Sequence, residues 1–179
     1  MDNLAYLSLG SNIAPEKNLP AAVRLLATMG RLVAVSSVWE TAPLGVINQP
    51  NFLNAAALVE TDMPALEFKQ KILQHIEQTL GRVRHADKFG PRSIDIDLML
   101  FNQQILDLDH RRIPDAEVLE RAFVAIPLAE IAPDYCHPET GQTLSEIAQQ
   151  FSITNETMSL HLAVSRAVAQ VICDDDQNN

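Results

Sequence analysis

The sequence predicts an α+β fold with a ferredoxin-like β-α-β-β-α-β core. Segments with a strand-like apolar pattern alternate with two segments in which apolar residues recur at the helical period. Their order along the chain is strand, helix, strand, strand, helix, strand. In this arrangement an antiparallel sheet carries both helices on one face. A chain of 179 residues with 47% apolar content is long enough to bury such a core in one domain.

The first strand is predicted at residues 4–9 and the first helix after Asn18. Glycine, serine and asparagine at residues 10–12 favour a turn at the end of the strand. Asn18 is expected to cap a helix that runs to Met29 with leucine, valine and alanine on its apolar face. Gly30 is expected to end that helix.

Two further strands and a second helix follow. The strands are predicted at residues 32–39 and 52–60, with a loop at 40–50 that contains two prolines and a glycine. The second helix is expected to begin near Pro64, because proline is tolerated in the first helical turn. Its apolar period continues to Gly81.

The last strand of the core is predicted at residues 94–101, and shorter elements follow it. These are a hairpin at 103–113 with a turn at Asp109 and His110, helical turns at 117–132, a helix at 144–150, a helix at 157–172 and a polar tail from 174 to 179.

The strand at 94–101 carries the most informative pattern in the chain. Its alternation separates two aspartates from the aliphatic residues, with Asp95, Asp97 and Met99 on one face and Ile94, Ile96, Leu98 and Leu100 on the other. Neighbouring carboxylates repel each other unless a hard cation lies between them, and Mg²⁺ prefers such oxygen ligands. Arg92, just before the strand, adds a bidentate donor for anions. Together these residues predict a phosphoryl-transfer site.

The alternative for this pair is a solvated strand edge, which is a common setting for Asp-x-Asp. The preceding segment favours a site, because four positive charges come before the acidic strand: Arg82, Arg84, Lys88 and Arg92. A basic loop with glycine and proline that leads to carboxylates suits a polyphosphate and its metal.

The loop at 41–54 is a second candidate site. Backbone groups in a loop that contains proline and glycine stay free to bind the edge of a flat heterocycle. Asn54 offers an amide donor and acceptor for such an edge, and Phe52 offers a ring for stacking. The alternative is a proline-rich connection with a buried asparagine.

Composition argues against several classes of protein. A formal net charge of −10 disfavours nucleic-acid binding, and no apolar run approaches the ~20 residues of a membrane span. The N-terminus lacks the basic region of a signal peptide. Cys136 and Cys173 have no metal-ligand spacing and indicate a reduced, cytoplasmic protein.

Several spaced motifs occur in one order along the chain: Leu9-Gly10-Ser11-Asn12, Thr41-Ala42-Pro43-Leu44-Gly45, Gln49-Pro50-Asn51-Phe52-Leu53-Asn54-Ala55, Gly81-Arg82-Val83-Arg84, Gly90-Pro91-Arg92-Ser93-Ile94-Asp95-Ile96-Asp97-Leu98 and Arg121-Ala122-Phe123. With these motifs the chain resembles the 6-hydroxymethyl-7,8-dihydropterin pyrophosphokinase family of folate synthesis over residues 4–150. The resemblance implies an αβα sandwich. One domain is therefore expected over residues 1–151, followed by an extension over 152–179 with a helix and a disordered acidic tail. The extension would serve as a dimer helix, a lid or a spacer.

The resemblance implies transfer of pyrophosphate from ATP to the hydroxyl of 6-hydroxymethyl-7,8-dihydropterin, leaving AMP. Two Mg²⁺ ions held by Asp95 and Asp97 would be the cofactors, and Arg82 and Arg92 would complete the catalytic set. The partners would be ATP and the dihydropterin, with no nucleic acid and no membrane. The chain would act in the cytoplasm as a monomer or a weak homodimer. The alternative is a pterin- or nucleotide-binding paralogue on the same fold, without turnover or with altered specificity.

The resemblance also assigns ligand-binding residues. Those implied for ATP are Gln74, Glu77, Arg84, Arg92, Leu98 and Arg121. Those implied for the pterin are Thr41, Ala42, Leu44, Phe52, Asn54 and Phe123.

Asp115 departs from the family pattern, which commonly has a phosphate-contacting histidine after the equivalent of Pro114. A carboxylate at that position repels a polyphosphate and predicts weaker ATP binding. Alternatively, Asp115 caps the helix that follows it. The missing positive charge would then come from His110, Arg111 or Arg112.

Overall fold

The computed structural model describes all residues except 1, 44–47, 84–89, 109–110, 155–156 and 177–179. Its centre is a twisted sheet with the strand order β5-β1-β4-β3-β8, in which β2 also pairs with β4 and each of these pairs is antiparallel. The strands are β1 (Asn3–Ser11), β2 (Arg31–Val35), β3 (Trp39–Thr41), β4 (Phe52–Thr61), β5 (Asp95–Phe101) and β8 (Ser159–Leu160). Since β1 lies between β4 and β5, the predicted ferredoxin-like core is confirmed.

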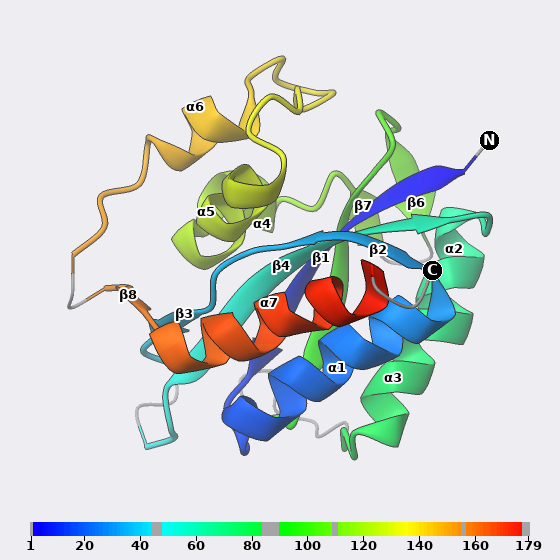
Figure 1. Cartoon of the computed structure of the whole chain (residues 1–179). Coiled ribbons are helices and arrows are strands. Elements are labelled where there is room, and N and C mark those ends of the chain that lie inside the picture. Colours follow the sequence, from blue (N-terminus) through cyan, green and yellow to red (C-terminus); the bar gives the residue numbers. More distant parts are fainter. Residues whose placement is uncertain (1, 44–47, 84–89, 109–110, 155–156, 177–179) are drawn as a thin grey trace.

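Helices cover both faces of this sheet (Figure 1). On one face lie α1 (Pro15–Met29), α7 (Leu162–Asp176) and the continuous helical segment α2–η1–α3 (Ala65–Phe68, Lys69–Leu73 and Gln74–Thr79). On the other face lie α4 (Glu117–Glu120), α5 (Ala122–Ile131) and α6 (Leu144–Ala148). The molecule is therefore the αβα sandwich that the sequence resemblance implies.

Each face of the sheet has its own apolar core. Leu7 and Leu9 of β1 are fully buried with Leu26 of α1 and Val168 of α7. On the opposite face, Tyr6 of β1 belongs to a second cluster with residues of α5 and α6, among them Val124, Leu128 and Ile147. Alternate side chains of β1 thus pack in the two apolar cores on opposite faces of the sheet.

The predicted hairpin is present beside the end of β5. Its strands β6 (Leu106–Leu108) and β7 (Arg111–Ile113) form a separate two-stranded antiparallel sheet. Leu108 and Ile113 anchor it in the core. The turn predicted at Asp109 and His110 lies outside the described residues.

Two predictions near the N-terminus were wrong. β1 does not turn at residues 10–12 but continues through Ser11, and Gly10 pairs with both Asn54 and Asp95. Helix α1 begins at Pro15 rather than after Asn18. The residue before it, Ala14, has a left-handed backbone (φ 44°) and makes no side-chain cap, and proline suits the first helical turn.

The strand predicted at residues 32–39 is divided into β2 and β3. Ser36 lies between them, and its side-chain Oγ accepts a hydrogen bond from the backbone N–H of Ala56 at 2.8 Å. Its own N–H donates to the Ala56 carbonyl at 2.9 Å. A hydroxyl here replaces part of the backbone ladder, which interrupts regular strand pairing.

The alternation predicted for β5 is broken near its end. Leu7 pairs with Leu98 while the adjacent Tyr6 pairs with Leu100, so Met99 is an extra residue opposite β1. The irregularity turns Leu100 to the same core cluster as Met99, on the face of α5. The prediction that Leu100 shares a face with Ile96 and Leu98 was therefore wrong.

The C-terminal segment joins the main sheet and its helical layer. β8 pairs with β3, and Val164, Val168 and Val171 of α7 pack in the core that contains α1. α7 begins at Leu162, later than the predicted helix, and extends to Asp176, beyond the predicted start of the tail. No helix in the described part of the chain is long and apolar enough to cross a membrane.

Candidate active site

The candidate site lies where β1 ends, β4 begins and β5 begins. Gly10 is its centre, because its backbone pairs with Asn54 on one side and with Asp95 on the other. A Cβ atom at Gly10 would lie 3.3 Å from Oδ1 of Asn54 and 4.0 Å from Cδ1 of Phe52. Glycine therefore lets the two candidate regions, the acidic pair and the loop before β4, approach closely.

Asp95, the first residue of β5, is held between two arginines. Its Oδ1 forms an ion pair with Nη1 of Arg82, and its Oδ2 forms one with Nη1 of Arg92. All three side chains are largely buried. The structure thus brings the predicted residues Asp95, Arg82 and Arg92 together, and both carboxylate oxygens are engaged.

Glu77 of α3 contacts the same cluster from the face of the sheet that carries α1. Its buried carboxylate accepts a hydrogen bond from the backbone N–H of Ile96 at 2.9 Å and pairs with Arg82. Burial raises the pKa of Glu77, while the Ile96 N–H and the Arg82 guanidinium act in the opposite direction. These contacts make Glu77 a support for β5 and Arg82.

Asp97 is paired with Arg111 of β7. The guanidinium grips the carboxylate with both terminal nitrogens: Nη1 contacts Oδ1, and Nη2 lies 3.2 Å from Oδ2. Burial and the nearby Asp95 carboxylate raise the pKa of Asp97, although Arg111 favours its charged form. The sequence names Arg111 only as one of three alternative sources of the positive charge missing at position 115, beside His110 and Arg112. In the structure Arg111 reaches the acidic pair, Arg112 pairs with Glu139, and His110 lies outside the described residues.

Asp115 is buried directly after the hairpin. Its Oδ1 accepts a hydrogen bond from the N–H of Glu117, the first residue of α4, at 3.0 Å. Its Oδ2 lies 3.3 Å from Nε of Arg111. The side chain therefore accepts from the first residue of α4, although Ala116 rather than Asp115 occupies the N-cap position, and it also joins the acidic site through Arg111.

The residues predicted for the pterin lie partly together. Nδ2 of Asn54 donates to Oγ1 of Thr41 at 2.9 Å across β3 and β4. The ring of Phe52 is 5.8 Å from the Arg92 guanidinium carbon, which brings an aromatic face to the basic side of the site. Ala42 is exposed just after β3. Leu44 and Arg84 lie outside the described residues.

Outside the predicted pterin loop, four further predicted residues make no hydrogen bond or ion pair to the acidic pair within the described ranges: Gln74, Leu98, Arg121 and Phe123. Leu98 is buried in the core on the face of α1, so its side chain is structural. Phe123 packs beside the second core cluster. Arg121, between α4 and α5, has a buried Nε with no hydrogen-bond partner among the described atoms.

Asn12 is a site residue that sequence reasoning treated as part of an ordinary turn. It is buried, and its Nδ2 donates to Oε1 of Gln49 at 3.1 Å and to the carbonyl of Pro50 at 3.2 Å. Its Oδ1 accepts from the backbone N–H of Arg92 at 2.8 Å. One amide therefore ties the segment before Phe52 to the segment that carries Arg92.

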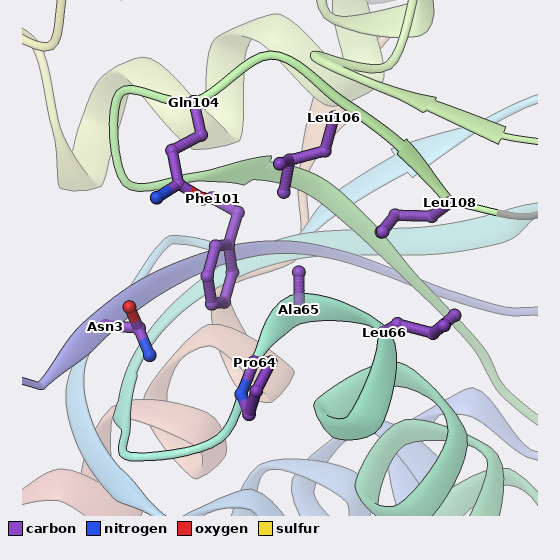
Figure 2. Close-up of a pocket in the computed structure, with 8 residues that line it drawn as sticks. All are labelled: Asn3, Pro64, Ala65, Leu66, Phe101, Gln104, Leu106 and Leu108. Atoms are coloured by element: carbon purple, nitrogen blue, oxygen red, sulfur yellow. The ribbon is translucent and has the colours of Figure 1, made fainter.

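A separate hollow of about 370 Å³ lies at the opposite end of the sheet (Figure 2). It is lined by Asn3 at the start of β1, Phe101 at the end of β5, and Pro64, Ala65, Leu66, Gln104, Leu106 and Leu108. None of these residues is charged. The hollow therefore does not suit a polyphosphate.

The chemistry of the acidic pair is compatible with magnesium. The described residues contain no cluster of three or more histidine, cysteine, aspartate or glutamate side chains suited to a metal. Mg²⁺ does not need one, because it commonly binds through one or two carboxylates together with substrate phosphates. Asp95 and Asp97, alternate residues on one strand beside three arginines, suit that mode of binding.

The sequence is similar to a known family and to several of its members. The family model for 7,8-dihydro-6-hydroxymethylpterin-pyrophosphokinase (HPPK) matches residues 6–133. The chain is 42% identical over 147 residues to the 2-amino-4-hydroxy-6-hydroxymethyldihydropteridine pyrophosphokinase of Pseudomonas aeruginosa, a match that covers 79% of this chain and 88% of that protein. It is 36% identical over 151 residues to the protein of the same name from Haemophilus influenzae, covering 83% and 92%.

Solved structures show the same fold. Wild-type HPPK-DHPS from Plasmodium falciparum with SDX-DHP superposes with a TM-score of 0.68 at 14% identity, covering 89% of this chain and 50% of that one. The chain thus spans half the length of that protein, and at this identity the likeness concerns the fold alone. The sequence matches, however, are extensive. The chain belongs to the 7,8-dihydro-6-hydroxymethylpterin-pyrophosphokinase family.

Proposed function

We propose that the chain transfers the pyrophosphate group of ATP to the hydroxyl of 6-hydroxymethyl-7,8-dihydropterin, as a step of folate synthesis. The family supports this reaction, and so do the names of the relatives. The single observation that carries it is the pair Asp95 and Asp97, which meets Arg82, Arg92 and Arg111 at one end of the sheet.

In this reaction the pterin hydroxyl oxygen attacks the β-phosphorus of ATP. The bond between that phosphorus and the oxygen bridging to the α-phosphorus breaks, the bridging oxygen leaves with AMP, and the hydroxyl proton is released. The charge on the phosphate oxygens needs fixed positive groups, and catalysis of phosphoryl transfer consists mainly of positioning and electrostatic stabilisation. Arg82 and Arg92 supply donors on the Asp95 side of the site.

Asp95 and Asp97 would hold two Mg²⁺ ions. When bound, these ions neutralise charge on the phosphates and help align them with the hydroxyl. The arginines that pair with the aspartates in this structure would then be available to the phosphates. Arg84, Gln74, Arg121 and, through its backbone, Leu98 remain proposed ATP contacts. The buried Nε of Arg121, which has no hydrogen-bond partner among the described atoms, supports its assignment.

The pterin would bind beside β4. Asn54 and Thr41 offer amide and hydroxyl groups for the ring edge, and the backbone of Ala42 and Leu44 offers further hydrogen bonds. Phe52 and Phe123 would lie against the ring faces. The role of Phe52 is better supported than that of Phe123, because the Phe52 ring lies near Arg92, which is proposed to bind the phosphates.

The proposal extends to the surroundings of the reaction. Dependence on ATP and two cysteines without disulfide pairing suit the cytoplasm. The net charge of −10 disfavours nucleic acid as a partner. We propose that the chain acts as a monomer or a weak homodimer.

Incubation of the purified chain with ATP, Mg²⁺ and 6-hydroxymethyl-7,8-dihydropterin tests the reaction. AMP and the pterin diphosphate should form in equal amounts, and AMP should not form when the pterin is left out. ADP as the main product, or a folded protein that binds both ligands without turnover, would defeat the proposal. The second result would identify a binding paralogue.

A further inference from the structure

Arg111 occupies an unusual position between two carboxylates. Both of its terminal nitrogens contact Asp97, and its Nε lies 3.3 Å from Oδ2 of Asp115. The side chain is 36% exposed, so it can be reached from solvent, whereas that of Asp115 is 10% exposed. The two terminal nitrogens of Arg111 thus contact Asp97, a proposed metal ligand, and its Nε contacts Asp115.

Asp115 cannot follow Arg111 if that side chain moves. Its Oδ1 is hydrogen-bonded to the N–H of Glu117, and its own N–H donates to the carbonyl of Met99 at 2.9 Å. These bonds join it to α4 and to β5. Asp115 is therefore a rigid acceptor, while Arg111 has a long side chain with rotatable bonds.

A cation bound at Asp97 would weaken the contact of Arg111 with Asp97 but not its contact with Asp115. The bidentate grip on Asp97 uses both carboxylate oxygens, so Mg²⁺ and Arg111 compete for them. When Arg111 leaves Asp97, its Nε keeps Asp115 as a counter-ion, and its terminal nitrogens become free donors. They would then lie next to the phosphates that accompany the metal.

From this geometry we propose that Arg111 binds the triphosphate of the nucleotide and that Asp115 is the positioning residue that keeps Arg111 at the site. The proposal rests on the proposed function. It reverses the expectation that Asp115 weakens nucleotide binding by repulsion. The Asp115 carboxylate is neutralised by Arg111, and the pair presents guanidinium donors to the ligand.

A double-mutant cycle tests the proposal. The variants are Arg111→Gln, Asp115→Asn and both together, and the probe is a non-hydrolysable ATP analogue titrated by calorimetry at saturating Mg²⁺. Arg111→Gln should weaken binding about tenfold or more, since a hydrogen bond to a charged group is lost. Asp115→Asn should weaken it less, and should have no effect once Arg111 is replaced.

The neighbouring arginine supplies a matched control. Arg112 follows Arg111 on β7 but is exposed and pairs with Glu139, away from the acidic pair. Arg112→Gln removes the same charge and should change the affinity by less than about twofold. Asparagine at position 115 can still accept the Glu117 N–H, and thermal melting of each variant checks that it is folded.

Three outcomes would overturn the proposal. Unchanged affinity in Arg111→Gln would make Arg111 only a counter-ion of Asp97. Tighter binding in that variant would make it a competitor of the metal. Tighter binding in Asp115→Asn, with or without Arg111, would mean that the carboxylate repels the nucleotide directly. Failure of the unaltered chain to bind the analogue or form AMP would instead reject the proposed function.

Discussion

At the scale of single residues, Asp97 is held in the folded chain at an energetic cost. The pKa of Asp97 is raised because its carboxylate is buried and lies near Asp95. A carboxyl group whose pKa is higher in the folded than in the unfolded state stabilises the fold only while it is protonated. That contribution is fully present below the ordinary pKa of aspartate and is lost as pH rises through the raised pKa of Asp97.

Asp97→Asn should therefore raise the melting temperature at neutral pH while removing activity. The variant removes the buried charge, and Arg111 retains Asp115 as a partner. Loss of an electrostatic group of this kind costs about 100- to 1000-fold in rate. Thermal melting between acid and neutral pH, together with the AMP assay, measures both effects.

The control for this variant is Asp107→Asn on β6, where the side chain is exposed. It should change neither the melting temperature nor the rate appreciably. A less stable Asp97→Asn chain with normal turnover would contradict both the raised pKa and the role of Asp97 at the metal.

Single residues also show why part of the site could be predicted and part could not. Asp95 and Asp97 are two positions apart on one strand, so strand periodicity alone brings them together. Arg111 and Asn12 reach the site through contacts with Asp97 and Arg92, which are 14 and 80 positions away. No local pattern encodes such distances, and basic or turn-forming residues are common in loops.

At the scale of elements, the C-terminal helix α7 is part of the packed core. α7 buries Val168 completely against the layer that contains α1, and β8 extends the sheet beside β3. The boundary at residue 151 stays a prediction. The packing does predict that α7 contributes to stability.

Val168→Ala should lower the free energy of unfolding by about 2 kcal/mol, since it removes two buried methyl groups and leaves a cavity. Leu162→Ala, in the first turn of the same helix, is the control, because Leu162 is 60% exposed. It removes more apolar volume but should change stability by less than about 0.5 kcal/mol. Urea denaturation measures both variants. Equal and small effects would show that α7 is detachable from the core.

The errors in predicting elements share a physical cause. Asn18 is a good capping residue, yet α1 starts earlier because Ala14 adopts a left-handed conformation and Pro15 suits the first turn. Ser36 interrupts a strand by bonding to Ala56, 20 positions along the chain. The order of the core strands and helices was predicted correctly, because it follows from periodicity within each segment, whereas β8 lies inside a segment predicted as helix. Where each element begins and ends depends instead on its tertiary partners.

At the scale of the whole molecule, the topology concentrates positive charge in an acidic protein. The chain carries a net charge of −10, yet Arg82, Arg92 and Arg111 converge at one end of the sheet. They arrive from the end of α3, the segment before β5 and the hairpin strand β7. In this structure their charges are balanced by Asp95, Asp97 and Glu77.

This balance predicts that metal and nucleotide bind together and that the metal binds poorly alone. Mg²⁺ by itself would have to displace arginines from Asp95 and Asp97, and so break ion pairs in a partly buried site with no new anion to replace the lost carboxylates. A nucleotide brings phosphates that take over these arginines as the metal takes the carboxylates. Calorimetric titration of Mg²⁺ should therefore give no saturable heat with the protein alone. It should give a clear binding isotherm once a non-hydrolysable ATP analogue is present, after subtraction of Mg²⁺ binding to the free analogue. Tight binding of Mg²⁺ to the protein without nucleotide would contradict this prediction, because it would show that the ion pairs with arginine do not hinder metal binding to the carboxylates.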